Sequence, residues 1–331
     1  MKAIVCTKYG LDALKLEEVP KPIPNDDEVL VKVQASSLNF ATLIRVKGKP
    51  FIVRPMIGGL LKPKYKIPGG EIAGQVEAIG RNVKQFKPGD EVYGDTCTCG
   101  YGAFAEYVCV PENVLALKPA NISFEEAAAV PQSALVALQG LHAGQIQKGQ
   151  KVLIYGSSGG IGTFAVQIAK SYGAEVTGVC STKNLEMVKS LGADKVIDYT
   201  KEDFTKNGQY YDLILAIRGY RSIYDYHRAL SPMGVYVMVG GSLAQIFQSA
   251  FLGPRVFKTG SKKIGKFTYT PNQKDFVFLK ELIEAGKVKP VIDKCYPLSE
   301  VGKAFRYFSE GHARGKVVIT VVHDKNLRME K

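Results

Sequence analysis

The chain of 331 residues lacks any apolar run approaching the ~18 residues that a membrane-spanning helix needs. Its opening residues, MKAIVCTKYG, also lack the apolar segment of a secretory signal peptide. Internal repeats and low-complexity tracts are absent, which excludes a repeat protein. We therefore expect a cytoplasmic globular protein. Its length suggests about two domains, because one core rarely grows past roughly 250 residues.

Closely spaced cysteines are scarce. Of the six cysteines, only Cys97 and Cys99 are near neighbours in the sequence. One intervening residue fits neither a zinc knuckle nor a redox Cys-x-x-Cys motif. We therefore expect the six cysteines to be reduced thiols that have no function in common, neither a shared metal nor a redox pair.

Acidic residues are missing from two long segments. Residues 29–70 contain none, and their cations are Lys32, Arg45, Lys47, Lys49, Arg54, Lys62, Lys64 and Lys66. Residues 226–274 also contain none, and their cations are Arg228, Arg255, Lys258, Lys262, Lys263, Lys266 and Lys274. The two segments together carry more positive charge than the net +13 of the whole chain. Such segregation indicates an anionic partner or surface.

The pattern of apolar residues changes near residue 125. The first part is rich in short strand-like runs broken by Pro and Gly, which is typical of a small barrel or sandwich. A capping box, Ser123 to Glu126, then opens an alanine-rich helix. Strands are expected at 151–155, 175–180, 195–198, 212–217 and 235–239, with helices at 161–172 and 185–191. Apolar strands alternating with helices predict a parallel sheet covered on both faces.

A glycine-rich turn joins the first of these strands to its helix. It reads Gly156-Ser157-Ser158-Gly159-Gly160-Ile161-Gly162. Glycine allows a tight turn and a close backbone approach to a diphosphate, and the helix N-terminus offers free N–H groups to the phosphates. The position between strand and helix predicts dinucleotide binding.

The same turn also matches the G-x-S-x-G nucleophile elbow of α/β serine hydrolases, with Ser158 as the nucleophile. Partner histidines are available at His227, His312 and His323. An elbow does not require the glycine at 162, however, and it leaves the first half of the chain without a role.

The end of the next strand selects the cofactor. An NAD site usually carries an acid here for the ribose 2′-OH. This chain instead has Ser181, Thr182 and Lys183, with no acid before Glu186. Hydroxyls and a cation suit the 2′-phosphate of NADP(H). The alternative, that Ser181 and Thr182 cap the following helix, does not explain Lys183.

Eight motifs in order resemble the medium-chain dehydrogenase/reductase superfamily, in its zinc-less quinone oxidoreductase branch. They are Ser36–Asn39, Pro68–Gly74, Lys87–Val92, Gly102–Glu106, Ala127–Pro131, the glycine turn, Leu191–Asp194 and Arg314–Val318. The resemblance implies a GroES-like β-barrel catalytic domain from residues 1–125 and 268–331. It implies a doubly wound α/β (Rossmann) domain from 126–267, a cofactor in the cleft between them, and a homodimer.

The departures from this family concern the metal. Zinc-dependent members carry Cys where Asn39 stands and His where Gly70 stands, and their four-Cys lobe has no counterpart here. Without these ligands no zinc site is expected. The metal-free Tyr-x-x-x-Lys pair of short-chain dehydrogenases is also absent. This favours electron-poor acceptors, a quinone or an α,β-unsaturated carbonyl, which accept hydride without a Lewis acid.

The resemblance also suggests roles for single residues. Asn39 would face the nicotinamide, and Arg314 with Lys316 would lie near the cofactor. Tyr199 would pack by the adenosine phosphate. The turn Gly240-Gly241-Ser242 would lie beside the nicotinamide ribose. Residues 216–219, Ala-Ile-Arg-Gly, stand where relatives usually have Asp-x-x-Gly after the fourth strand. Arg218 in this segment either faces the cofactor or lies at the surface.

Residues 45–66, the basic loop, mix cations with apolar side chains. The apolar residues are Phe51, Ile52, Val53, Met56, Ile57, Leu60 and Leu61. The loop either lines the active site or contacts an anionic membrane surface, as a peripheral protein would.

Nucleic-acid binding is an alternative of another class, but no RNP, KH or zinc-finger motif supports it. Neither the substrate nor a proton donor is fixed, since Tyr101 and Tyr269 are candidates without support from spacing.

Overall fold

The computed structural model describes the chain except residues 56, 58, 219–220, 242, 259 and 324–331. The chain forms two compact units. Unit 1 comprises residues 1–132, 271–284 and 290–331, and unit 2 comprises residues 133–270 and 285–289. In the described part of the chain, no helix is both long and apolar enough to cross a bilayer.

Unit 1 is built on a mainly antiparallel sheet. Its strands run in the order β14-β15-β3-β4-β5-β7, and β6 pairs with β3 as well. Their bounds are β3 Glu28–Ser37, β4 Glu71–Ile79, β5 Glu91–Asp95, β6 Tyr107–Pro111, β7 Leu115–Leu117, β14 Ile292–Pro297 and β15 Lys316–Thr320. A separate hairpin joins β1 (Lys2–Cys6) to β2 (Leu14–Glu18). Alternating apolar residues of β3, such as Val29, Val31 and Val33, are buried in the core of this unit.

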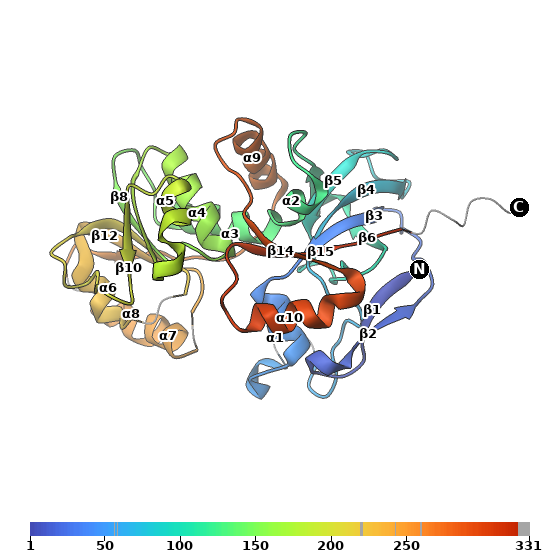
Figure 1. Ribbon diagram of the computed structural model, residues 1–331, viewed down its shortest axis with the longest axis horizontal. Helices are drawn as coiled ribbons and strands as arrows, with labels where there is room; N and C mark the ends of the chain where they lie inside the picture. Colours follow the sequence, from blue (N-terminus) through green and yellow to red (C-terminus); the bar gives the residue numbers. More distant parts are fainter. Residues whose placement is uncertain (56, 58, 219–220, 242, 259, 324–331) are drawn as a thin grey trace, which may run out of the picture. The chain divides into compact units, whose positions relative to one another are not determined.

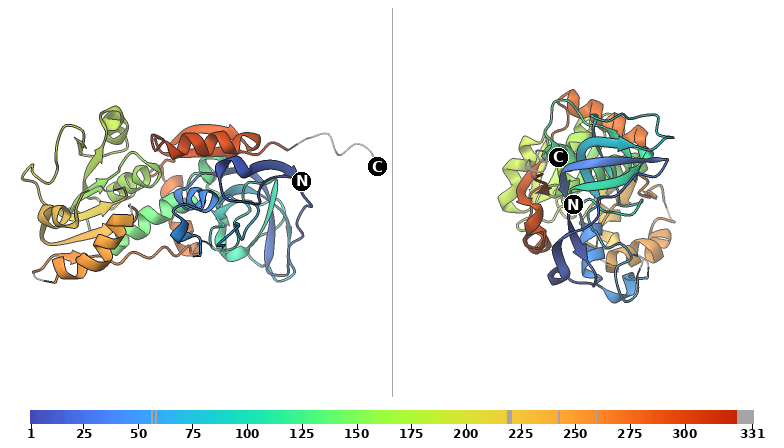
Figure 2. Two further views of the ribbon diagram at one scale, coloured as in Figure 1. Left: turned by 90° about the horizontal axis from the view of Figure 1, so that it is seen from below. Right: turned by 90° about the vertical axis from the view of Figure 1, so that its right-hand side faces the viewer.

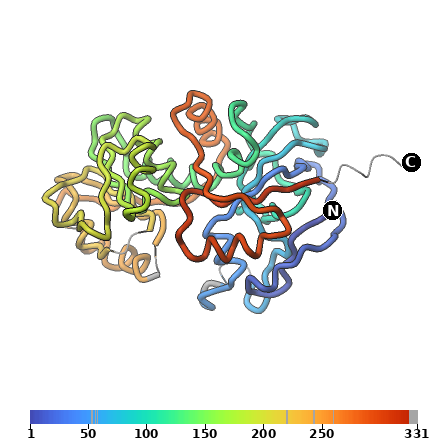
Figure 3. The backbone as a smooth tube through the Cα atoms, in the orientation of Figure 1, coloured from blue at the N-terminus to red at the C-terminus, as the bar shows by residue number. Residues whose placement is uncertain are grey.

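The C-terminal part of the chain completes unit 1. β15 pairs antiparallel with β3, with Val318 opposite Ser37, so the last strand lies beside an early one (Figure 3). Helix α10 (Val301–Ser309) is fixed from both sides, since Phe305 contacts Phe104 edge to face and Arg306 pairs with Asp12. Helix α9 (Gln273–Glu284) is tied to β5 because the Tyr93 hydroxyl donates to the Phe276 carbonyl at 2.8 Å.

Unit 2 contains a six-stranded parallel sheet in the order β10-β9-β8-β11-β12-β13. Its strands are β8 Lys151–Tyr155, β9 Glu175–Cys180, β10 Lys195–Asp198, β11 Tyr211–Ala216, β12 Leu230–Met238 and β13 Lys263–Ile264. This is the doubly wound order of a dinucleotide-binding sheet. Helices α4 (Gly160–Ser171) and α5 (Leu185–Ser190) cover one face, and α6 (Ile223–Ala229) and α8 (Gly253–Val256) the other (Figures 1 and 2). The sequence prediction of a parallel sheet covered on both faces is confirmed.

The remaining helices include one of 13 residues and three shorter ones. They are α1 (Phe40–Lys47), α2 (Phe124–Ala128), α3 (Pro131–Ala143) and α7 (Leu243–Phe247), and a π-helical turn, Gln248–Leu252, joins α7 to α8. The capping box predicted at the start of α2 is present, with Ser123 and Glu126 bonding each other's backbone. α1 ends at Gly48, which adopts the left-handed conformation common after helices.

Candidate functional site

A buried ion pair lies at the centre of a polar cluster in unit 1. Glu71 is the first residue of β4 and Lys316 the first residue of β15. Their side chains are 0% and 3% exposed, and Lys316 Nζ lies 2.7 Å from Glu71 Oε2. The same ammonium donates to the Leu38 carbonyl at 3.0 Å. A buried charge is tolerated only when it is paired and hydrogen-bonded, as both are here.

Asn39 belongs to this cluster. As the N-cap of α1 it accepts from the Thr42 backbone N–H at 2.8 Å, and its Nδ2 donates to Glu71 Oε2 at 3.0 Å. The backbone N–H of Gln132 donates to the other oxygen of Glu71 at 2.9 Å. Asn39 is 4% exposed, and these bonds make it a positioning residue for the Glu71 carboxylate. Its expected role in positioning the nicotinamide or substrate stays a prediction.

Lys316 also has a role that the sequence did not reveal. It was expected near the cofactor, yet its ammonium is enclosed in unit 1 between Glu71 and a carbonyl. The geometry makes it the counter-ion of Glu71. Arg314, two residues earlier, is exposed. Contact of either residue with a cofactor stays a prediction.

The position of Gly70 decides whether zinc fits. A Cβ built on Gly70 would lie 2.2 Å from Cys97 Sγ, so no side chain fits there without displacing the thiol. Cys97 Sγ also accepts from Gln132 Nε2 at 3.4 Å and lies 3.9 Å from Asn39 Nδ2. The residues therefore do not fit a catalytic zinc, and the described residues contain no cluster of three or more His, Cys, Asp or Glu suited to a metal.

Cys97 is a free thiol, as expected, and it contacts residues that the sequence does not link to it. It follows β5, and its backbone N–H donates to Asp95 Oδ1 at 2.7 Å. Burial, followed by the charge of Asp95, raises the pKa of Cys97 well above its usual range. The group therefore stays a neutral thiol. No spacing signal marks it, because its contacts with Asn39 and Gln132 are distant in sequence.

In unit 2 the glycine turn has the geometry of a phosphate-binding loop. Gly156 has φ +89°, a conformation that L side chains rarely adopt. A Cβ on Gly162 would meet the Gly156 carbonyl oxygen at 2.1 Å. α4 has no side-chain cap, and its first helical bond is Thr163 N–H to the Gly159 carbonyl. The N–H groups of residues 160–162 therefore point toward solvent or a ligand, and the turn fits a diphosphate.

The hydrolase alternative is not supported by this geometry. A nucleophile elbow places its serine at a strained apex of the turn. Among the described non-glycine residues, positive φ occurs at Tyr101, Gln145 and Met233, and not at Ser158. The Ser158 hydroxyl accepts from Asn184 Nδ2 at 3.1 Å, which ties the turn to the end of β9.

The residues expected to bind the 2′-phosphate come together at the carboxyl ends of β9 and β10. Ser181 and the exposed Lys183 follow β9, and Tyr199 follows β10 with its backbone N–H bonded to the Cys180 carbonyl at 3.1 Å. Thr182 differs from the expectation because its hydroxyl donates to the carboxylate of Asp198. Hydrogen bonds from Thr182 first, and then from Thr200, lower the pKa of Asp198.

The proposed capping alternative at this position is wrong. Neither Ser181 nor Asn184, the N-cap residues of the two short helical segments after β9, makes a side-chain capping bond. Ser181 Oγ instead accepts from Asn184 Nδ2 at 3.2 Å, so its own proton is free to donate to a ligand.

Three other predicted residues lie at the same edge of the sheet. Arg218 follows β11, and its backbone N is 3.4 Å from the position that a Cβ on Gly156 would take. Gly240 and Gly241 follow β12, which is parallel to β11. Ser242 lies outside the described residues.

Comparisons with known proteins agree with this geometry. Residues 25–120 match the family model described as alcohol dehydrogenase GroES-like domain, and residues 191–319 match zinc-binding dehydrogenase. A 2-methylene-furan-3-one reductase of Solanum lycopersicum is 38% identical over 96% of this chain and 79% of the relative. The chain belongs to the medium-chain dehydrogenase/reductase superfamily. Its branch is the quinone oxidoreductase-like one, and it is an oxidoreductase.

Further medium-chain relatives give the same assignment. An NADPH-dependent alkenal/one oxidoreductase of Arabidopsis thaliana is 36% identical over 96% of this chain and 79% of the relative. The structure of the quinone oxidoreductase from Coxiella burnetii has a TM-score of 0.86 and 28% identity, and covers 97% of this chain and 99% of that chain. The predicted GroES-like and Rossmann architecture of a medium-chain reductase is thereby confirmed.

We predict that removing the charge of Glu71 destabilises unit 1 strongly. Glu71→Gln leaves the Lys316 ammonium buried without a counter-ion, which costs about 3–5 kcal/mol. Urea unfolding followed by circular dichroism measures this loss. Asp12→Asn, which breaks the exposed pair with Arg306, is the control and should cost less than about 1 kcal/mol. Equal effects of the two substitutions would show that the buried pair is not important for stability.

Proposed function

We propose that this chain is an NADPH-dependent reductase that transfers hydride to a quinone or an α,β-unsaturated carbonyl without zinc. Two relatives that align with nearly the whole chain are named for such acceptors, a 2-methylene-furan-3-one and alkenals or alkenones. A third, 32% identical, is named a chloroplast envelope quinone oxidoreductase homolog.

The observation that carries the proposal is the contact between Gly70 and Cys97. The thiol occupies the volume that a histidine at position 70 would need. Oxidation of a simple alcohol requires a group that accepts the alkoxide charge, and these residues cannot hold a metal for that task. A conjugated carbonyl needs less help, because it accepts hydride once it is positioned against the donor.

NADPH, when bound, supplies the hydride. The N–H groups of residues 160–162 would hold its diphosphate, and Ser181, Lys183 and Tyr199 would hold the 2′-phosphate. Arg218, Gly240 and Gly241 follow the neighbouring strands, where the ribose and nicotinamide would bind. A cytoplasmic homodimer is part of this proposal, and light scattering tests the dimer.

We predict that Lys183→Asp reverses the cofactor preference. The substitution replaces the exposed cation by an anion that repels a 2′-phosphate but accepts the hydroxyls of a free ribose. The ratio of kcat/KM for NADPH to that for NADH should fall by about tenfold or more. Lys189→Asp, an equal charge change on an exposed residue of α5, is the control and should leave the ratio unchanged. An unchanged ratio in Lys183→Asp would refute the assignment.

The activity itself is tested with chelator-treated protein. We expect oxidation of NADPH, and slower oxidation of NADH, with both a naphthoquinone and a simple enone as acceptors. The rates should be the same with and without chelator, since a conjugated carbonyl accepts hydride without a Lewis acid. Activity that disappears with the chelator and returns with zinc would overturn the metal-free mechanism.

An anionic lipid surface is a second partner that we propose, through the basic loop. Its Ile52 and Leu61 are 73% and 84% exposed, and Lys49, Lys62 and Lys64 are exposed beside them. Met56 lies outside the described residues. Apolar side chains interleaved with cations favour an interface with anionic head groups, at about 1 kcal/mol per cation.

The relatives do not support the nucleic-acid alternative, since all those named above are oxidoreductases.

We expect the protein to co-sediment with vesicles containing phosphatidylglycerol, to do so less at high salt, and not to bind neutral vesicles. Ile52→Ser with Leu61→Ser should weaken this binding several-fold. Ile23→Ser is the matched control, since Ile23 is 87% exposed in unit 1 but lies outside the basic loop. Equal binding to neutral and anionic vesicles would contradict the proposal.

A further inference from the structure

Tyr101 has an unusual backbone conformation. It lies in the loop after β5 with φ +67°, in the left-handed region that a bulky residue rarely adopts. Its backbone N–H donates to the Thr96 carbonyl at 2.9 Å, which helps to hold the conformation. Such strain costs about 1–3 kcal/mol and occurs preferentially at functional positions. The conformation therefore calls for a functional explanation, which the side chain provides.

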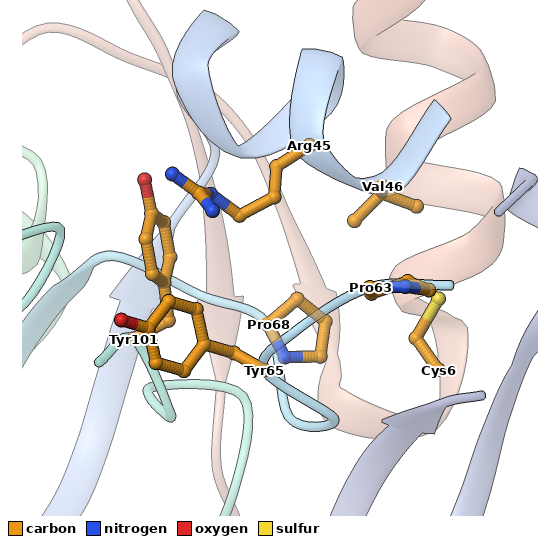
Figure 4. A pocket seen from close by; sticks show the side chains of 7 residues that line it. All are labelled: Cys6, Arg45, Val46, Pro63, Tyr65, Pro68 and Tyr101. Carbon is orange, nitrogen blue, oxygen red and sulfur yellow. The ribbon is translucent and has the colours of Figure 1, made fainter. Parts of the chain in front are cut away.

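The ring of Tyr101 is held between two groups. The guanidinium carbon of Arg45, on α1, lies 4.4 Å from the ring centroid, and the Tyr65 ring lies 5.8 Å away. Figure 4 shows the Tyr101 hydroxyl on the same side as the Arg45 nitrogens, and these residues line a small pocket. The residue is only 5% exposed. The phenol is thus fixed in one orientation beside a permanent cation.

Tyr101 adjoins the polar cluster described above. It lies in the same loop as Cys97, and the Cys97 thiol and the Arg45 guanidinium both act on the pKa of its hydroxyl. Cys97 in turn contacts Asn39 and Gln132. Tyr101 therefore adds a dissociable O–H to a cluster in which the other strong groups, Glu71 and Lys316, neutralise each other.

Two buried polar atoms on α1 remain without a partner among the described residues. They are Thr42 Oγ1 and Arg45 Nε, three residues apart and therefore on one face of the helix. Thr42 Oγ1 lies 3.4 Å from the position that a Cβ on Gly70 would take. A buried donor without an acceptor lowers the stability of the fold unless a ligand or a water molecule accepts its hydrogen bond. The face of α1 toward Gly70 and Tyr101 is thus suited to an oxygen-bearing ligand.

We propose that Tyr101 is the proton donor for reduction of α,β-unsaturated carbonyls, with Arg45 stabilising the phenolate that forms. The proposal rests on the reductase function given above. The bound cofactor would supply hydride to the β-carbon of the acceptor, which would leave an enolate. The O–H bond of Tyr101 then breaks, a C–H bond forms at the α-carbon, and the phenolate recovers its proton from water.

The charges around Tyr101 suit this role. Burial, as the largest effect, raises the pKa of Tyr101, so the phenol is protonated at neutral pH, while Arg45 opposes this shift. Three groups face the ring. They are Arg45 from α1, Cys97 from the loop after β5, and Tyr65 from the loop before β4. Only Arg45 carries a permanent charge, and its sign favours the phenolate. Tyr269, the other tyrosine considered from the sequence, belongs to unit 2 and not to this cluster.

The test compares Tyr101→Phe with Tyr65→Phe, a substitution of the same chemistry on the neighbouring ring. Tyr101→Phe should lower kcat with an enone by about 10²-fold or more, and leave the Kd for NADPH unchanged. Turnover of a naphthoquinone should change little, because its protons go to oxygens that exchange with water. Tyr65→Phe should retain both activities. Arg45→Met should slow enone reduction, and Arg45→Lys should partly restore it.

A stereochemical readout separates proton donation from a structural effect. With an α-methyl enone the wild type should protonate the α-carbon from one face, whereas Tyr101→Phe should give nearly equal amounts of both stereoisomers. Wild-type rate and selectivity in Tyr101→Phe would overturn the proposal, as would equal losses with enone and quinone. If the wild type reduces neither acceptor, the reductase function itself fails, and the role of Tyr101 fails with it.

Discussion

Unit 1 depends on the solvation of one buried carboxylate, that of Glu71. Water is replaced around it by the Lys316 ammonium, the Asn39 amide and the backbone N–H of Gln132. These groups come from β15, from the N-cap of α1 and from the start of α3. If any of these groups moved away, the Glu71 carboxylate would lose a buried partner. The interaction therefore holds the ends of β4, β15, α1 and α3 in one arrangement.

This arrangement limits the chemistry available at the site. With Glu71 neutralised by Lys316, neither residue is free to act as a general acid or base. Gly70 beside them cannot be replaced by a metal ligand while the Cys97 thiol occupies the adjoining volume. The acids that the described residues of this cluster offer are weak ones, the Cys97 thiol and the Tyr101 phenol. Weak acids suffice for an enolate, which is a far stronger base than a simple carbonyl oxygen.

The parts of the molecule that could be predicted from the sequence are those encoded locally. The glycine turn, the capping box at Ser123 and the strands of unit 2 each follow from residues a few positions apart, where backbone geometry and side-chain period decide the structure. By contrast, Lys316 and Glu71 are 245 residues apart in the sequence, and Cys97 and Gln132 are 35 residues apart. No local rule pairs such residues. The family resemblance placed Asn39 and Lys316 near the cofactor, which stays a prediction, and it gave no sign of their bonds to Glu71.

Asp198 shows why the missing long-range contacts matter for the cofactor as well. A carboxylate at the end of β10 opposes the binding of a 2′-phosphate, since it accepts a hydrogen bond from Thr182, one residue before Lys183. Its oxygens, however, already accept from Thr182 Oγ1 and from the backbone and hydroxyl of Thr200, and Lys201 lies 3.9 Å away. These donors stabilise the carboxylate and occupy its oxygens, Lys201 partly screens its charge, and Lys183 is exposed to an incoming ligand. The NADPH preference proposed above therefore requires the attraction of the phosphate to the free Lys183 charge to exceed its repulsion by a carboxylate that already has a cation nearby.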